Sequence, residues 1–221
     1  MRNSLYFARL VKYIENYNFG EFFNDVNVED FIDYFYQVST EYQNGLWRCD
    51  YGATKLVIIM DEEDIVFKIP FNSDYDFLEK SCMFFYGAPA PSTWDYCEAE
   101  EERYAVAEEN GFANLLAKTN IVYTTKNGIR IYTQPKCFTR THIKPNSKKK
   151  YLTFSTWYKR QMPIDNLCWL NTFIDYYGAY RMKKFFDFLI EEEWDDDLCG
   201  SNIGYDMNGA PVLIDYSSYM E

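Results

Sequence analysis

The sequence predicts an α+β fold, with helices towards both ends of the chain and β-strands in its middle. Two patterns favour this class. Apolar residues recur at helical spacing near both ends, whereas the middle holds short alternating or β-branched runs joined by turn residues. Aromatic residues make up 20% of the 221 residues, so the chain can bury a large core, in one domain or in two small lobes.

Two helices are expected in an N-terminal helical extension over residues 1–45. Residues 4–19 have an apolar residue at every third position along one face. Residues 28–43 predict a second helix, with Asn27 as its N-cap and Gly45 just after its end.

The period of the pattern changes after residue 46. One strand is expected just before Gly52. Two more are expected over residues 55–60 (KLVIIM) and 64–71 (DIVFKIPF), which the acidic turn 61–63 joins. Residues 72–94 have the composition of a loop.

A helix and a hairpin complete this strand-rich lobe, which we expect to cover residues 46–136. The helix covers residues 95–111 and ends at a glycine. Residues 120–136 predict a hairpin that turns at Asn127-Gly128, a dipeptide typical of tight β-turns.

Helices return in the last part of the chain, the expected second lobe over residues 137–221. Residues 155–161 and 171–193 have helical spacing. A short hairpin is then expected over residues 202–216, with its turn at 207–209.

Composition argues against several classes of protein. The net charge of −12 argues against general nucleic-acid binding. No run of 18 apolar residues exists, and the N-terminus alternates charged and apolar residues, which argues against a membrane span and a signal peptide. Six scattered cysteines without a C-x-x-C pair predict reduced thiols and a cytoplasmic protein. His142 is the only histidine, so neither a His-rich zinc site nor a His-based triad is expected.

The positive charge of the chain is concentrated in one stretch, residues 136–160. This stretch holds eight basic and no acidic residues, which leaves 14 basic and 34 acidic residues elsewhere. It is either a solvated loop or a docking surface for an acidic protein partner or nucleic acid. Its basic residues are Lys136, Arg140, Lys144, Lys148, Lys149, Lys150, Lys159 and Arg160.

Three polar residues near the end of the chain predict a site for phosphoryl transfer. Asp197, Asn202 and Asp215 have the spacing D-x4-N-x12-D. Asn202 opens the expected hairpin and Asp215 closes it, so both side chains should reach one end of it. Amide and carboxylate oxygens are ligands that suit Mg²⁺. Asp197 can face the same point as a base or an orienting group, and phosphoryl transfer needs little else from a protein.

These residues resemble the protein-kinase-like superfamily, whose catalytic loop reads D-x-x-x-x-N and whose metal-binding aspartate closes the following hairpin. Upstream, VFKIPF resembles the strand that carries the nucleotide-binding lysine, here Lys68. The helix of residues 95–111 lies where the family places the glutamate that pairs with this lysine. Glu100 and Glu101 both lie near its inward face, and Glu100 is preferred because it precedes Tyr104 by one helical turn.

The resemblance also implies a nucleotide site and a fold. Gly52 falls where the family has its phosphate-covering loop, and backbone groups from Gln134 to Lys136 would meet adenine at the hinge. ATP and Mg²⁺ are the implied cofactors. The implied fold is a five-stranded antiparallel N-lobe sheet with a C helix and a reduced helical C-lobe. The similar segments span roughly residues 50–216, and they also look like small kinase-like proteins that bacteriophages and prophages encode.

The sequence departs from the family pattern at four points. Gly52 is the only glycine of the expected phosphate loop, and Lys55 either supplies charge there or is an ordinary surface lysine. Asp-Asp at 195–196 stands where the family has His-Arg, and Asp-Tyr-Ser at 215–217 replaces Asp-Phe-Gly. Only six residues follow Asp215, so a conventionally docked peptide substrate is not expected.

Two main interpretations of function follow. The first is an ATP- and Mg²⁺-dependent phosphotransferase of unknown acceptor, in which Asp197 orients or deprotonates the acceptor. The second is a pseudokinase-type binding protein, in the host cytoplasm if a phage encodes it, that occupies and inhibits a host defence or regulatory protein. Transfer of a nucleotidyl group from a reversed nucleotide stays open. So does a purely structural role for the acidic turn and the hairpin.

Overall fold

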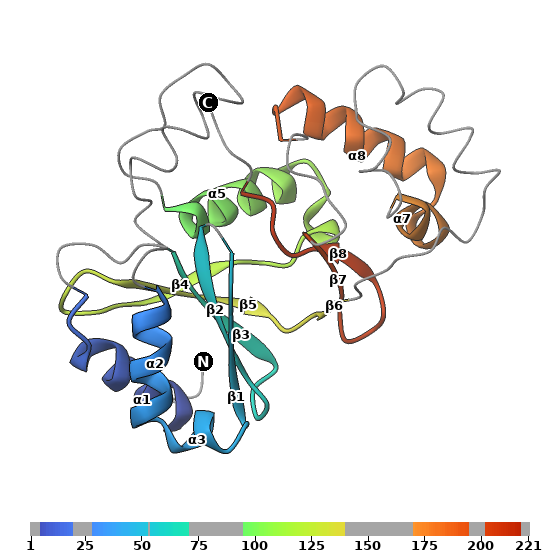
Figure 1. Cartoon of the computed structure of the whole chain (residues 1–221). Helices are drawn as coiled ribbons and strands as arrows, with labels where there is room; N and C mark the ends of the chain where they lie inside the picture. Colours follow the sequence, from blue (N-terminus) through green and yellow to red (C-terminus); the bar gives the residue numbers. More distant parts are fainter. Residues whose placement is uncertain are drawn as a thin grey trace. The chain divides into compact units, whose positions relative to one another are not determined.

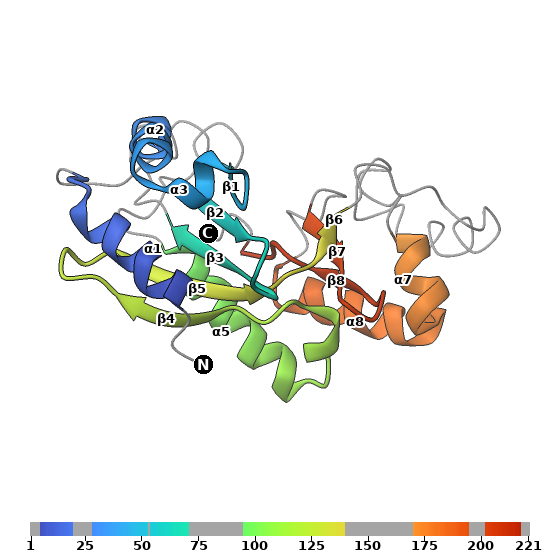
Figure 2. The ribbon, with the colours of Figure 1, turned by 90° about the horizontal axis from the view of Figure 1, so that it is seen from below.

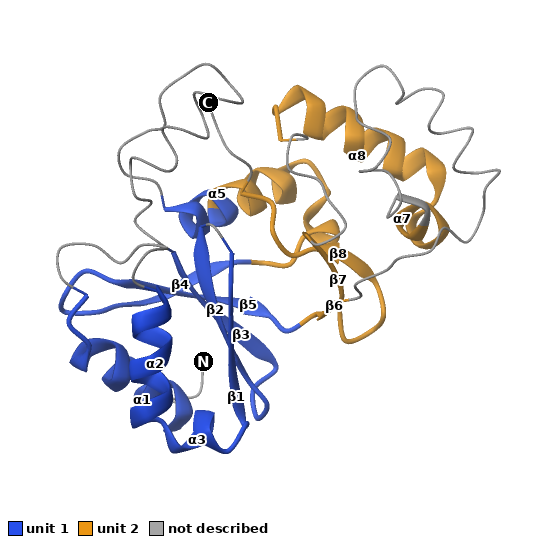
Figure 3. Ribbon diagram, viewed as in Figure 1, with its two compact units in different colours: residues 1–101, 119–136, 221 blue, residues 102–118, 137–220 orange. Residues whose placement is uncertain are grey.

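The chain divides into two compact units (Figure 3). Unit 1 comprises residues 1–101, 119–136 and 221, and unit 2 comprises residues 102–118 and 137–220. The predicted α+β class is confirmed, because helices accompany an antiparallel sheet of five strands. No helix in the described ranges is both long enough and apolar enough to cross a membrane. The computed structural model describes residues 5–19, 28–52, 54–70, 95–139, 170–194 and 202–217.

The five-stranded sheet lies in unit 1 and has the order β1-β2-β3-β5-β4 (Figures 1 and 2). Every neighbouring pair is antiparallel, as the sequence predicted. The β4–β5 turn contains the expected glycine, Gly128, at a φ of 86°, a backbone conformation that favours glycine. The strands are β1 (Trp47–Tyr51), β2 (Lys55–Met60), β3 (Ile65–Pro70), β4 (Asn120–Thr124) and β5 (Arg130–Pro135).

The N-terminal helices pack on one face of this sheet. Helices α1 (Leu5–Asn16) and α2 (Val28–Val38) share a buried cluster with apolar side chains of β1, β2, β3 and β5. Trp47 is fully buried in this cluster and stacks on Phe35, with ring centroids 5.8 Å apart. The N-terminal extension is therefore part of the same unit as the sheet. The cluster includes Leu10, Ile14, Phe31, Leu56, Ile58, Met60, Phe67 and Ile69.

The predicted helix over residues 28–43 is interrupted at Ser39, so the prediction of one continuous helix was wrong. Ser39 has an extended backbone and acts as the N-cap of a separate short helix, α3 (Thr40–Gln43). Its side chain accepts a hydrogen bond from the N–H of Tyr42, at 3.2 Å. Serine satisfies free N–H groups at a helix start better than it continues a helix, which explains the break. The expected cap Asn27 lies outside the described residues.

The described residues of unit 2 after residue 136 form two helices and a small sheet. The predicted helix over residues 171–193 is divided at Gly178, whose φ of 86° is not helical, into α7 (Leu170–Tyr177) and α8 (Ala179–Glu191). Buried aromatic and aliphatic side chains of both helices, including Phe173, Phe185, Phe186 and Leu189, form the core of this unit. The expected helix over residues 155–161 and the expected loop over residues 72–94 lie outside the described residues.

The predicted C-terminal hairpin is present and has a third strand beside it. Strands β7 (Ile203–Tyr205) and β8 (Pro211–Leu213) form the hairpin, and β6 (Phe138–Thr139) pairs with β7. A two-residue strand is too short to produce a readable sequence period, so it was missed. Gly204 permits the close packing of β7, because a Cβ atom there would lie 2.7 Å from the Cβ of Cys137.

Helix α5 (Tyr96–Glu109) is the predicted acidic helix and passes from unit 1 into unit 2. Gly111 follows its end at a φ of 78°, as expected for a C-terminal glycine. The chain then forms a short 3-10 helix, η1 (Ala113–Leu115), before it returns to unit 1 at Thr119.

Candidate functional site

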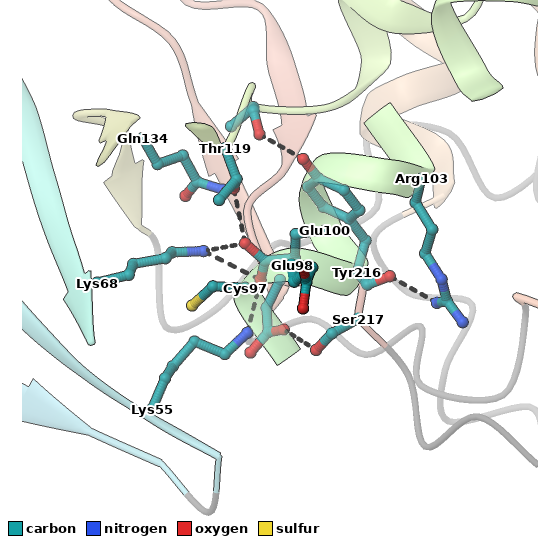
Figure 4. A network of polar contacts seen from close by, with 12 residues as sticks. Lys55, Lys68, Cys97, Glu98, Glu100, Arg103, Thr119, Gln134, Tyr216 and Ser217 are labelled. Carbon is teal, nitrogen blue, oxygen red and sulfur yellow. Dashed lines mark hydrogen bonds and ion pairs between the residues drawn. The ribbon is translucent and has the colours of Figure 1, made fainter. Parts of the chain in front are cut away.

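The sheet of unit 1 presents Lys68 on the face opposite to the N-terminal helices. Lys68 pairs with Val57 of β2 and Tyr132 of β5, whereas its neighbour Phe67 belongs to the cluster under α1 and α2. Side chains alternate between the faces of a sheet, so Lys68 projects the other way. Its side chain is 4% exposed, and its Nζ lies 2.8 Å from Oε2 and 3.1 Å from Oε1 of Glu100 (Figure 4).

Glu100 is the centre of a buried polar cluster. It projects from α5 and is fully buried. Thr119 donates a hydrogen bond to its Oε2 at 2.7 Å, and Gln134 donates to Thr119 at 3.0 Å (Figure 4). Glu101 is only half-buried, and its Oε1 accepts a hydrogen bond from the N–H of Ile121 at 3.4 Å. The structure therefore brings Lys68 to Glu100, the glutamate that the sequence favoured. The catalytic role of this pair stays a prediction.

Lys55 belongs to the same cluster, so its interpretation as an ordinary surface lysine was wrong. It is 4% exposed, and its Nζ lies 2.5 Å from Oε1 of Glu100. The register explains its position. Lys68 pairs with Val57, so Lys55, two residues along β2, lies on the same face. Register is a long-range property that the run KLVIIM does not reveal by itself, and this is why the sequence left the role of Lys55 open.

One carboxylate thus lies between two ammonium groups, and the three side chains together carry one net positive charge. At an effective dielectric constant of about 20, opposite charges about 3 Å apart attract by roughly 5 kcal/mol, and like charges about 5 Å apart repel by roughly 3 kcal/mol. Glu100 can therefore hold both lysines side by side. Burial raises the pKa of the nearby Cys97 thiol well above its usual range, and Lys55 offsets only part of this, so the thiol adds no charge to the cluster.

Asp95 fixes the start of α5 and hence the position of Glu100. Its Oδ1 caps the helix by accepting hydrogen bonds from the N–H groups of Cys97 and Glu98, at 2.9 and 3.0 Å. Its Oδ2 accepts a hydrogen bond from the hydroxyl of Tyr132 at 2.7 Å and lies 3.3 Å from Arg130. Burial and the bond to Asp95 raise the pKa of Tyr132, so Tyr132 remains a donor. Sequence reasoning missed these positioning residues, because their contacts join distant segments.

The other predicted nucleotide-binding residues of unit 1 take part in local hydrogen bonds. The N–H of Gly52 donates to the carbonyl of Lys55 at 3.1 Å, within the β1–β2 hairpin. The N–H of Lys136 donates to the carbonyl of Asp64 at 2.8 Å, and its Nζ donates to the carbonyl of Met60 at 2.8 Å. Gln134 is buried and directs its side chain to Thr119. Contact of these residues with a nucleotide stays a prediction.

In unit 2, the hairpin brings Asn202 and Asp215 to one end, as the sequence predicted. The carbonyl of Asn202 accepts a hydrogen bond from the N–H of Ile214 at 2.8 Å, so Asp215 follows directly beside this pair. Asn202 is buried, and Asp215 is half-buried and accepts a hydrogen bond from Ser217 at 3.2 Å. The third predicted residue, Asp197, lies outside the described residues.

The segment after Asp215 is held by two buried contacts within unit 2. Arg103 of α5 donates a hydrogen bond to the carbonyl of Tyr216 at 2.7 Å, and the Tyr216 hydroxyl donates to the carbonyl of Ala117 at 2.8 Å (Figure 4). The guanidinium of Arg103 also lies over the ring of Trp194, 5.0 Å from its centroid. These contacts fix the backbone next to Asp215. Arg103 was not among the predicted site residues.

The donor set at the hairpin suits a magnesium ion, although it is small. Among the residues that the structure describes, no group of three or more His, Cys, Asp or Glu side chains could hold a metal ion. Asn202 and Asp215 offer one amide oxygen and one carboxylate. Mg²⁺ is commonly held by one or two carboxylates together with phosphate oxygens of a substrate, so two protein ligands are chemically sufficient.

Comparison with known proteins gives no family for the chain: no protein-family model matches it, and neither does any curated protein.

Proposed function

We propose that the chain is a kinase-like phosphotransferase that uses ATP and Mg²⁺. The observation that carries this proposal is the buried ion pair between Lys68 of β3 and Glu100 of α5. A lysine held by a carboxylate has a fixed position, which suits contact of its ammonium group with nucleotide phosphates. The same pair, in the same chain order, is what the resemblance to the protein-kinase-like superfamily implies.

Unit 2 supplies the remaining groups of this proposal. Asn202 and Asp215 would hold the magnesium ion, whose charge neutralises phosphate oxygens during transfer. Asp197 would orient the acceptor hydroxyl and accept its proton. The bonds of Arg103 and Ala117 to Tyr216 support the assignment of Asp215, because a metal ligand needs a backbone that does not shift.

The test is ATP turnover, measured as ADP release by the full chain in the presence of Mg²⁺. We expect Lys68→Met and Asp215→Asn each to reduce turnover to background, because one removes the phosphate contact and the other removes a metal ligand. Lys126→Met is the matched control, since Lys126 is exposed in the β4–β5 turn of unit 1. Turnover that survives in either site variant would contradict the assignment.

One observation favours the second interpretation, a pseudokinase-type binding protein. The Gly52 N–H is used inside the β1–β2 hairpin, so the backbone cover that phosphates receive in an active kinase is reduced here. In that case the chain would act by occupying a host defence or regulatory protein through the basic stretch 136–160. Binding to such a partner would then survive Asp215→Asn and fail when Lys148, Lys149 and Lys150 are all changed to Glu.

A further inference from the structure

We propose that Lys55 is a second phosphate-binding residue, which forms with Lys68 a paired-ammonium site that selects ligands with a chain of phosphates. The inference rests on the proposed function, because it concerns the same nucleotide. It names the part of the nucleotide that the site recognises, its phosphate chain, and it decides between the two roles that the sequence left open for Lys55.

The connection between β1 and β2 is short. Only Ala53 and Thr54 separate Gly52 from Lys55, and the N–H of Gly52 donates to the carbonyl of Lys55 at 3.1 Å. Loops that bind phosphate usually offer several N–H groups in a concave backbone segment. The connection has three residues, 52–54, and the N–H of Gly52 is already used within the hairpin, so little backbone is left to offer. Positive charge for a phosphate chain must therefore come mainly from side chains.

Glu100 holds the ammonium groups of the two lysines close together. The Nζ atoms of Lys55 and Lys68 lie 2.5 and 3.1 Å from the same atom, Oε1 of Glu100 (Figure 4). The two nitrogens are therefore no farther apart than the sum of these distances. Both side chains are at most 5% exposed, so neither samples solvent as a surface lysine does. Glu100 thus fixes two positive charges side by side before any ligand arrives, which reduces the entropy that binding would lose.

The paired ammonium groups of Lys55 and Lys68 match a ligand that carries a chain of phosphates. A carboxylate or a single phosphate presents its negative charge at one place, where one ammonium group is a sufficient partner. A chain of phosphates carries negative charge on successive groups, so two neighbouring ammonium groups can each contact a different phosphate. Burial strengthens both contacts, because the effective dielectric constant is lower than in water. The pair should consequently favour tripolyphosphate or a nucleoside triphosphate over a nucleoside monophosphate.

The test compares the melting temperature of the full chain with sodium tripolyphosphate and with AMP. The proteins are the wild type, Lys55→Gln, Lys68→Gln and the control Lys126→Gln, which removes one charge from an exposed turn of the same unit. We expect tripolyphosphate to stabilise the wild type and the control more than AMP does, by mass action. Lys55→Gln should weaken tripolyphosphate binding by about 10- to 100-fold, the loss expected for one charged hydrogen bond, and should change AMP binding much less.

Two results would overturn the inference. One is unchanged tripolyphosphate affinity in Lys55→Gln, which would make Lys55 a purely structural partner of Glu100. The other is equal stabilisation of the wild type by tripolyphosphate and AMP, a result that needs no variant and so holds even if Lys55→Gln does not fold. Lys55-dependent tripolyphosphate binding without ATP turnover would keep the paired site and remove the phosphotransferase. ATP turnover that needs Lys68 but not Lys55 would support the phosphotransferase and contradict the paired site.

Discussion

The two faces of the sheet in unit 1 are built on different physical principles. On one face, β2 contributes Leu56, Ile58 and Met60, all fully buried against aromatic side chains from the N-terminal helices. On the other face, the same strand contributes Lys55, Val57 and Ile59. Lys55 is buried in the ion cluster with Glu100, while the two aliphatic side chains are only half-buried.

The apolar face should therefore contribute mainly to the stability of the fold, and the polar face mainly to ligand binding. The apolar face gains its free energy from area and packing, which are non-directional, so its effect on ligands should be indirect. The polar face depends on a few charged groups at fixed distances, so it contributes less area but defines a place for an anion. Substitutions on the two faces should therefore give different patterns in two measurements, the free energy of unfolding and the stabilisation by Mg-ATP.

The largest loss of stability is expected for Trp47→Ala on the apolar face. Removal of a fully buried tryptophan should lower the free energy of unfolding by about 4 kcal/mol, through lost burial and the cavity that remains. Urea unfolding measures this loss. Mg-ATP should still raise the free energy of unfolding of the Trp47→Ala protein. Loss of Mg-ATP binding in a folded Trp47→Ala protein would break the proposed separation between the faces.

Trp47→Phe is the matched control for that substitution. Within the described part of the chain, the buried indole N–H of Trp47 has no hydrogen-bond partner. Phenylalanine removes this buried donor and keeps an aromatic ring beside Phe35, so we expect a loss of only about 1 kcal/mol, within the range of core changes that largely preserve shape. A loss equal to that of Trp47→Ala would show that the indole has a specific partner.

Glu100→Gln should give a loss of stability of similar size, but it should also abolish stabilisation by Mg-ATP. The substitution leaves two buried ammonium groups beside each other without their shared carboxylate, and removal of one partner from a buried ion pair costs about 3 to 5 kcal/mol. Because Lys55 and Lys68 would separate, Mg-ATP should no longer raise the melting temperature. Calorimetry with and without Mg-ATP measures both effects. A protein that keeps full stabilisation by Mg-ATP would show that the cluster is only structural.

A smaller contrast is expected between two buried threonines of unit 1. Thr119→Val removes the hydroxyl that donates to Glu100 and accepts from Gln134, so the free energy of unfolding should fall by about 1 to 2 kcal/mol. Thr133 pairs with Phe67 and so lies on the apolar face. Thr133→Val should be close to neutral, because a methyl group replaces a hydroxyl among apolar neighbours. Urea unfolding of the two variants, which differ only in position, compares the faces directly, and equal losses would refute the contrast.

The sequence predicted the apolar face better than the polar face, for a physical reason. Burial leaves a periodic trace, so the positions of the strands and of the acidic helix could be predicted from apolar spacing and turn residues. The ion cluster depends on strand register and on contacts between distant segments, and neither leaves a local trace. Lys68 and Glu100 were identified through a family resemblance, whereas the place of Lys55 required the register of the sheet, and Thr119 and Asp95 required contacts between distant segments. The breaks at Ser39 and Gly178 were missed because the apolar period continues across both.

The smallest expected effect is an acid sensitivity of the N-terminal helices. Burial opposes ionisation of Glu41, but backbone hydrogen bonds and the ion pair with Arg9 outweigh it and lower the pKa of Glu41. A lowered pKa in the folded state means that Glu41 stabilises the fold above its unfolded pKa of about 4.3, and that this stability is lost as the pH falls below it. Glu41→Gln should reduce the loss of stability between about pH 4.5 and pH 3, measured by urea unfolding. Arg9 is nearly half-exposed, so the difference should be well below 1 kcal/mol. A larger difference would mean that the apolar face also depends on a specific ion pair, which would narrow its contrast with the polar face.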